Sequence, residues 1–239
     1  IKEEDVETSG ILQHSGYYYK LIRFHGAPTQ EVPKNVIIWK YTSYATLLSG
    51  IALLIMIYYM NADILMIDER VNASISSLMA ILISIFSIAG SWIIYDFLSK
   101  SKLINYKIIF PAVLLIIFTA ISFSLTKIYG SRFAFLQMGI ILGTIMSMNV
   151  FFVISKNSIA ISLAAANKTK FDLNLSIQAK QRSVANNIIT LPTLFIMLSS
   201  SHGSFIWINS YNWLILGLLT AILGLIQYYV NWKNKKESN

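Results

Sequence analysis

The densest group of side chains that could bind a ligand lies between residues 181 and 187. This stretch reads Gln-Arg-Ser-Val-Ala-Asn-Asn, and its polar members include Gln181, Arg182, Asn186 and Asn187. A guanidinium offers a flat fork of donors, and each amide offers donors together with an acceptor. The set suits a planar, anionic, amide-rich ligand. Helix capping combined with a basic anchor is the alternative explanation for the same residues.

Two further polar side chains interrupt or end long apolar stretches. Asn149 could bond a neighbouring helix or point into a cavity, and both explanations stay open. Asp96 is followed four residues later by Lys100, a spacing that predicts an ion pair on one helical face. Polar groups in an apolar environment are costly, so each needs a partner and can mark a site.

The histidines give no sign of a metal or haem site. His14 and His25 precede the first long apolar stretch, and His202 follows the fifth. None lies within such a stretch, where the axial ligands of a haem held between helices would be expected. The absence of cysteine excludes disulfides, thiolate nucleophiles and iron–sulfur ligation. No zinc, P-loop, nucleophile-elbow or dinucleotide pattern occurs, so we expect no metal site and no encoded cofactor.

Helices that cross a lipid bilayer must position these residues. Of the 239 residues, 55% are hydrophobic and 13% are charged, about half the charged share of a soluble domain. About 20 apolar residues span the ~30 Å hydrocarbon core. Apolar runs of about this length predict six spans, at about 41–60, 76–98, 108–126, 133–155, 184–201 and 211–231. The predicted fold is all-α, a polytopic integral membrane helical bundle, rather than a large soluble protein with buried helices.

The basic residues predict the orientation of the bundle. Sixteen of the 19 Lys and Arg residues fall in the N-terminal segment 1–40, the second and fourth connections and the tail. The other side holds Arg70, Lys127 and Arg132. We therefore expect segment 1–40 to be a cytoplasmic leader and both ends of the chain to face the cytoplasm. The net charge of +8 then lies against anionic membrane lipid and requires no nucleic acid.

Three features predict local geometry within this frame. Gly139 and Gly143 lie four apart, a spacing that lets a neighbouring helix approach closely. Pro192 falls inside the fifth span and should kink it or free a backbone carbonyl. Residues 159–166 could form a short helix lying at the membrane interface.

Several segments, in order and at near-constant spacing over almost the whole chain, resemble one known family. They include His14-Ser15-Gly16-Tyr17-Tyr18-Tyr19, Tyr58-Tyr59-Met60-Asn61-Ala62-Asp63, Gly90-Ser91-Trp92 with Tyr95-Asp96, Tyr129-Gly130-Ser131-Arg132, Gly143-Thr144-Ile145-Met146 with Asn149, and, most strongly, Lys180-Gln181-Arg182-Ser183-Val184-Ala185-Asn186-Asn187 with Thr190-Leu191-Pro192. These segments are similar to the membrane domain of bacterial cytochrome c-linked urate oxidases.

The resemblance implies one domain over residues 1–239, related to a family domain of about eight spans in the bacterial inner membrane. The first and last family spans would be missing from this chain, which leaves six with both ends cytoplasmic. It implies an oxidoreductase of purine catabolism that converts urate, or a related purine, to 5-hydroxyisourate. Electrons would pass to the haem of cytochrome c, in a separate or missing domain, or to a quinone. Substrate binding would fall to Gln181, Arg182, Asn186, Asn187 and Asn149.

Two places depart from the family pattern. Ala185 stands where the family has a His before the two Asn residues, and Val36–Thr42 lacks the His and Glu of the family's first span. A general base would be sought among such residues, so His14 is the matching ionisable candidate for catalysis. The losses favour an alternative function, a catalytically inactive member acting as a purine-like solute carrier or membrane subunit. A haem-bearing electron conduit is a third possibility, weakened by the lack of histidines within the spans.

Overall fold

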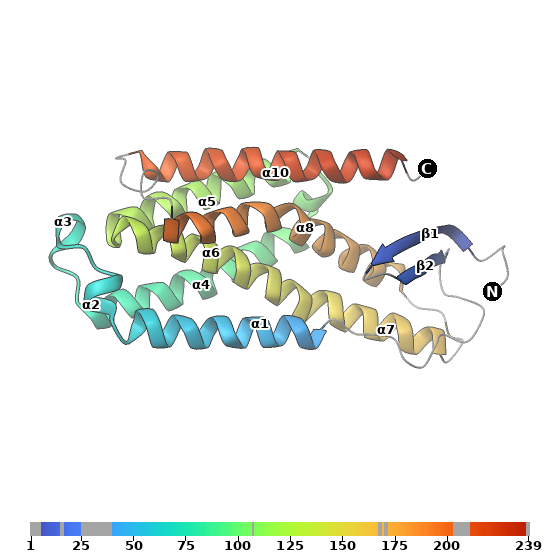
Figure 1. The fold of residues 1–239 in the computed structure, drawn as a ribbon, viewed down its shortest axis with the longest axis horizontal. Helices are drawn as coiled ribbons and strands as arrows, with labels where there is room; N and C mark the ends of the chain where they lie inside the picture. Colours follow the sequence, from blue (N-terminus) through green and yellow to red (C-terminus); the bar gives the residue numbers. More distant parts are fainter. Residues whose placement is uncertain are drawn as a thin grey trace.

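The structure, a computed structural model, is an elongated bundle of helices with a β-hairpin at one end (Figure 1). It describes residues 6–14, 17–24, 40–106, 108–166, 169, 172–202 and 211–237. Successive long helices run in alternating directions along the long axis (Figure 1). As a result, α1 begins and α10 ends at the same end of the bundle, where α7 and the start of α8 also lie.

Within the described residues, five helices are long and apolar enough to cross a membrane. They comprise α4 (Ser77–Lys100), α5 (Ile109–Ile128), the continuous helix Ser131–Ala164, and most of α8 (Leu173–His202) and α10 (Asn212–Glu237). A shorter apolar helix, Tyr44–Tyr59, combines most of α1 (Lys40–Leu53) with a π-helical segment, Leu54–Tyr59. The predicted polytopic helical membrane bundle is confirmed.

The third of these long helices is continuous through three segments. It consists of α6 (Ser131–Met148), a π-helical segment (Asn149–Ile154) and α7 (Ser155–Ala166). The region expected to form a separate interfacial helix, 159–166, instead prolongs this helix, because α7 is rich in Ala and Ser and contains neither Gly nor Pro. The 34 residues of Ser131–Ala164 span about 51 Å, so the helix exceeds the ~30 Å hydrocarbon core.

Short elements join the long helices. Between α1 and α4 lie α2 (Ala62–Leu65) and α3 (Glu69–Asn72), and a 3-10 turn, Lys102–Asn105, follows α4. Asp68 caps α3 by accepting from the backbone N–H of Arg70, and its carboxylate also pairs with the Arg70 guanidinium. These hydrogen bonds to the charged form lower the pKa of Asp68.

The β-hairpin was not predicted from the sequence. Strand β1 (Val6–His14) pairs antiparallel with β2 (Tyr17–Phe24), so that His14 lies opposite Tyr17, with an irregularity between Val6 and Thr8. The Tyr-rich sequence of β2 favours a strand. The hairpin lies at the same end of the long axis as α7 (Figure 1).

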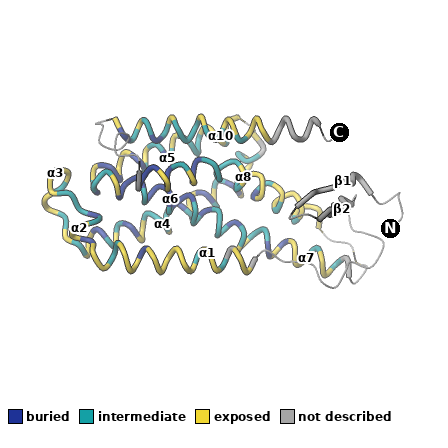
Figure 2. Tube along the Cα trace, in the orientation of Figure 1, coloured by how far each residue is buried: buried dark blue, intermediate teal, exposed yellow. Residues whose placement is uncertain are grey.

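Helix α6 forms the centre of the bundle, and most outward faces of the other helices are apolar and exposed (Figure 2). The buried residues of α6 are Phe133, Ala134, Phe135, Gln137, Met138, Gly139, Ile141, Leu142 and Ile145. Large side chains such as Phe97 and Ile116 point away from the core and are 75% and 68% exposed. Such apolar exposure is suited to lipid.

The predicted close packing applies to one of the two glycines. A Cβ at Gly139 would lie 2.9 Å from Cγ of Met197 and 3.4 Å from Cγ2 of Ile196, both on α8. A Cβ at Gly143 would meet no atom within 4 Å. The absence of a side chain at Gly139 therefore sets how closely α6 and α8 approach.

This difference predicts that one substitution has different effects at the two sites. Gly139→Ala should lower the free energy of unfolding by about 1–3 kcal/mol, because the added methyl group overpacks the α6–α8 contact. Gly143→Ala, the matched control, should be neutral or stabilising, since Ala favours helix over Gly. Unfolding of the detergent-solubilised protein measures both, and equal losses would contradict the packing account.

Candidate functional site

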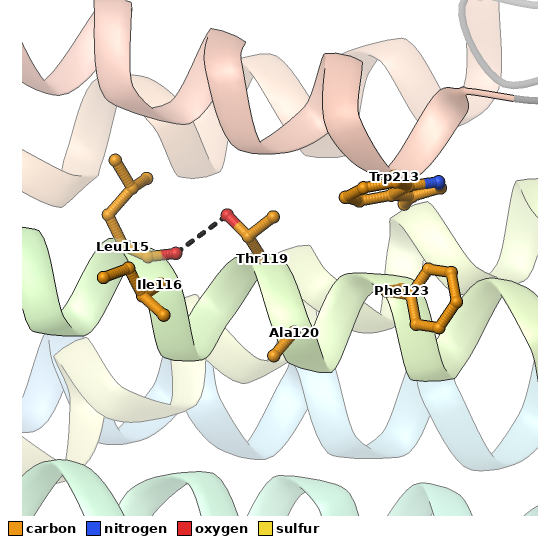
Figure 3. A pocket seen from close by; sticks show the side chains of 6 residues that line it. All are labelled: Leu115, Ile116, Thr119, Ala120, Phe123 and Trp213. Atoms are coloured by element: carbon orange, nitrogen blue, oxygen red, sulfur yellow. Dashed lines mark hydrogen bonds between the residues drawn. The ribbon is translucent and has the colours of Figure 1, made fainter.

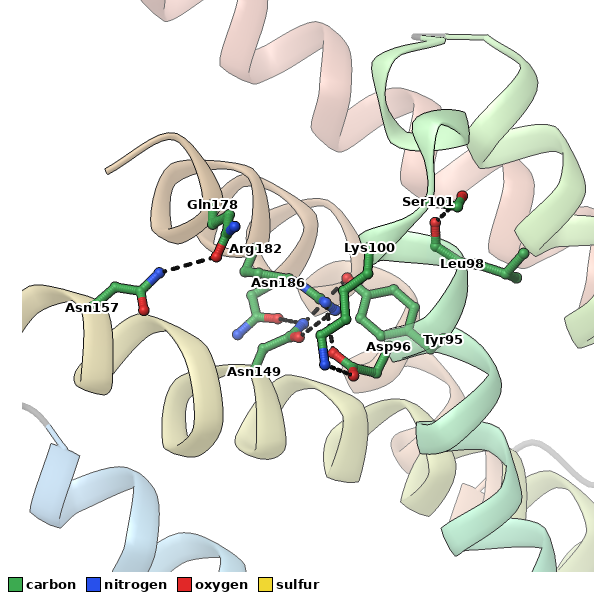
Figure 4. A network of polar contacts seen from close by, with 10 residues as sticks. All are labelled: Tyr95, Asp96, Leu98, Lys100, Ser101, Asn149, Asn157, Gln178, Arg182 and Asn186. Atoms are coloured by element: carbon green, nitrogen blue, oxygen red, sulfur yellow. Dashed lines mark hydrogen bonds and ion pairs between the residues drawn. The ribbon is translucent and has the colours of Figure 1, made fainter. Parts of the chain in front are cut away.

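Arg182 is the centre of a polar network that joins α4, α8 and the π-helical segment (Figure 4). Its side chain is 4% exposed. Nη2 donates to Oδ1 of Asp96 at 2.7 Å, and Nη1 donates to Oδ1 of Asn149 at 3.1 Å. A buried cation is costly unless it is paired and hydrogen-bonded, and Asp96 and Asn149 meet both conditions.

Asp96 connects this buried cation to a second, exposed one. The other carboxylate oxygen, Oδ2, lies 2.5 Å from Nζ of Lys100, which confirms the predicted ion pair between residues four apart. The Asp96 side chain is 19% exposed and that of Lys100 is 69% exposed. The carboxylate therefore stands at the border between the buried guanidinium and the outside of the bundle.

Asn149 is fully buried and contributes both ends of its amide. Its oxygen accepts from Arg182, while Nδ2 donates to the Tyr95 hydroxyl at 3.2 Å and to Oδ1 of Asn186 at 2.7 Å. The Nδ2 of Asn186 donates in turn to the carbonyl of Met146 at 2.9 Å. Asn149 bonds neighbouring helices, as one of its two sequence-based explanations requires.

Asn149 is also the first residue of the π-helical segment Asn149–Ile154. A π-helical turn shifts the backbone hydrogen bonds by one residue and reorients the side chains around it. Such turns occur frequently at functional sites. The irregular backbone therefore coincides with the side chain that links Arg182 to Asn186.

The Tyr95 ring provides an aromatic surface beside the cation. Cζ of Arg182 lies 5.1 Å from the ring centroid, within the range of a cation–π contact. Tyr95 is 3% exposed, and Trp92 one helical turn away is 6.3 Å from it between ring centroids. The site thus combines a guanidinium, a carboxylate, two amides and an aromatic face.

A family model described as urate oxidase N-terminal matches residues 2–239. The chain belongs to this family. The match contains every residue of the Arg182 network and confirms the resemblance noted in the sequence. Comparisons with curated proteins and with solved structures give no match.

In this urate oxidase N-terminal chain, three of the five expected substrate-binding residues meet and two do not. Arg182, Asn149 and Asn186 form the network, whereas Gln181 is half-buried outside it. The exposed Asn187 accepts at Oδ1 from Nε2 of Gln227 on α10, at 3.0 Å. Helix geometry explains the division, because residues four apart share a face and neighbours are rotated by about 100°.

Of the three histidines of this family member, the structure describes the backbone of His14 and of His202. His14 is the last residue of β1, with its side chain outside the described part, and His25 is also outside it. His202 ends α8, remote from the end where β1 lies (Figure 1). Within the described ranges, no group of three His, Cys, Asp or Glu residues could hold a metal ion.

Sequence reasoning missed a second buried network, centred on Gln137 of α6. Its Nε2 donates to the carbonyl of Ser84 at 3.0 Å and to Oγ of Ser87 at 2.8 Å, and its Oε1 accepts from Oγ of Ser84 at 3.0 Å. The Tyr59 hydroxyl lies 2.9 Å from the same Ser84 oxygen. A glutamine inside an apolar stretch was the available signal. The four residues are fully engaged with one another, which indicates a structural role.

A hollow of about 490 Å³ lies between α5 and α10, lined by Leu115, Ile116, Thr119, Ala120, Phe123 and Trp213 (Figure 3). The Thr119 hydroxyl donates to the Leu115 carbonyl at 2.8 Å, so this donor is already used. Trp213 packs edge-on against Phe123, 5.2 Å between ring centroids. The lining is almost wholly apolar and offers a polar purine little to bind.

The network predicts a large stability effect at Asn149. Asn149→Ala should lower the free energy of unfolding by about 2 kcal/mol or more, because Nη1 of Arg182 and Oδ1 of Asn186 lose a buried partner. The control Asn174→Ala removes an exposed amide near the start of α8 and should change stability by less than about 0.5 kcal/mol. Denaturant unfolding in detergent measures both free energies of unfolding. A loss for Asn149→Ala as small as that for Asn174→Ala would show that the network adds nothing to stability.

Proposed function

We propose that this chain is the urate-oxidising membrane domain of a cytochrome-linked oxidoreductase, with its substrate site at Arg182. Membership of the urate oxidase N-terminal family supports the reaction class. The observation that carries the location is the buried guanidinium, 4% exposed, which is bonded to the amide of Asn149, which in turn is bonded to the amide of Asn186. An anionic oxopurine presents oxygens to such donors and N–H groups to such acceptors.

The proposed reaction converts urate and water to 5-hydroxyisourate, releasing two electrons and two protons. Arg182 would balance the charge of the urate anion, and Asn149 and Asn186 would orient its amide-like edges. The electrons would pass to the haem of a cytochrome c, in a separate protein or domain, or to a quinone. His14 would help to accept the protons, as the matching ionisable residue of the family-like segment.

We further propose that the domain lies in the bacterial inner membrane with this site near the cytoplasmic face. Lys100 is the last residue of α4 and pairs with Asp96 of the network, Lys156 lies in α7, and Lys180 lies in α8 two residues before Arg182. The preference of basic residues for the cytoplasmic side supports this orientation. Urate would then enter the site from the cytoplasm.

The proposal predicts coupled redox chemistry in the full-length protein. Urate added with oxidised cytochrome c should lose its absorbance while haem is reduced, with two haems reduced per urate consumed. Spectrophotometry follows both signals, and protein without urate is the control. Folded, urate-binding protein that changes neither signal would contradict the enzyme assignment.

The alternative is a family member that binds or carries a purine-like solute without oxidising it. The absence of the family's His at Ala185, and of the His and Glu in Val36–Thr42, favours this function. Uptake of labelled urate into proteoliposomes with no product formed would support it. Arg182→Ala should weaken urate binding under either function.

The two adjacent asparagines test the location of the site. Asn186→Ala should weaken urate binding by about tenfold, because it removes an amide held directly beside Asn149. Asn187→Ala should change affinity by less than about twofold, since Asn187 faces Gln227 of α10. Isothermal titration calorimetry measures both, and a larger effect at Asn187 would place the ligand on the other side of α8.

A further inference from the structure

The guanidinium that would receive the substrate anion is already occupied by an anion of the chain itself. Both terminal nitrogens of Arg182 are engaged, Nη2 by the Asp96 carboxylate and Nη1 by Asn149. A carboxylate and a bound oxopurine anion present the same kind of acceptor to the same donors. They also repel each other, so both cannot share Arg182 at low cost in a buried site. Asp96 is therefore an internal competitor for the substrate.

Lys100 offers the displaced carboxylate a second partner without a large movement. It lies one helical turn beyond Asp96 on α4, and its Nζ is already 2.5 Å from Oδ2 of Asp96. The Asp96 side chain is 19% exposed and that of Lys100 is 69% exposed, so the carboxylate can leave Arg182 while Lys100 still holds it at the edge of the bundle. Neither charge is left unpaired, because the substrate anion replaces Asp96 on Arg182 and Lys100 retains Asp96.

We propose that Asp96 is a specificity-determining residue of the substrate site: its carboxylate occupies Arg182 in the empty site and transfers to Lys100 when an anionic oxopurine binds. This inference rests on the proposed function of the Arg182 site. It identifies the preferred ligand as one whose own negative charge can displace a carboxylate. A neutral purine brings no charge to replace that of Asp96 and is excluded by the competition.

The proposal predicts opposite effects at two residues of one ion pair. Asp96→Asn should tighten urate binding by about tenfold, because the charged competitor is removed while a side-chain oxygen stays beside Arg182. Lys100→Gln should weaken binding by about tenfold, because the displaced carboxylate loses its second partner. The double variant should resemble Asp96→Asn, since Lys100 acts only through the carboxylate.

Isothermal titration calorimetry of the full-length protein in detergent, with urate as the probe, tests these effects. The matched control is Lys102→Gln, which removes a nearby exposed lysine and should change the affinity by less than twofold. Circular dichroism and thermal unfolding establish that each variant is folded. If Asp96→Asn does not fold, Lys100→Gln and Lys102→Gln decide the question, because both remove cations from the outside of the bundle.

Two results would overturn the inference while leaving the proposed function in place. Weaker urate binding by folded Asp96→Asn would make Asp96 a structural partner of Arg182 only. Equal effects of Lys100→Gln and Lys102→Gln would remove Lys100 as the acceptor of the carboxylate. A wild-type protein that binds no urate would instead overturn the proposed function itself, and the inference with it.

Discussion

A guanidinium buried in a membrane-spanning bundle requires neighbouring helices to supply its counter-charge and its acceptors. For Arg182 on α8, Asp96 on α4 provides the charge and Asn149, where α6 continues into the π-helical segment, provides a neutral oxygen. These contacts fix the rotation and the axial position of three helices relative to one another. The close approach of α6 to α8 at Gly139 supports the same arrangement from a point further along the helices.

Two of the three helices that carry this network depart from regular backbone hydrogen bonding. The π-helical segment begins at Asn149, and α8 continues through the buried Pro192, which has no N–H to donate to the carbonyl one turn earlier. The hydroxyls of Thr190 and Thr193 donate to the carbonyls of Asn186 and Ile189. Irregular segments of this kind give a site places where side chains can rearrange without unfolding the helices, as exchange of the Arg182 partner would need.

The sequence predicted the features that depend on composition and short spacing, namely the helical membrane bundle, the pair of Asp96 with Lys100, and a cluster of polar side chains that includes Arg182 and Asn186. It did not predict that Asp96 reaches Arg182, because the two are 86 positions apart and packing alone brings them together. It grouped Gln181 and Asn187 with Arg182, although helical periodicity turns them to other faces. The Gln137 network was missed because its partners come from separate helices, and the β-hairpin was missed because it depends on the pairing of two strands in the N-terminal segment.

An experimental structure of the full-length protein with urate bound tests the central claim most directly. The account predicts urate in contact with Arg182 and Asn149, with the Asp96 carboxylate held by Lys100 and separated from the guanidinium. Urate bound elsewhere, with Arg182 and Asp96 still paired, would contradict it and leave the network a purely structural one.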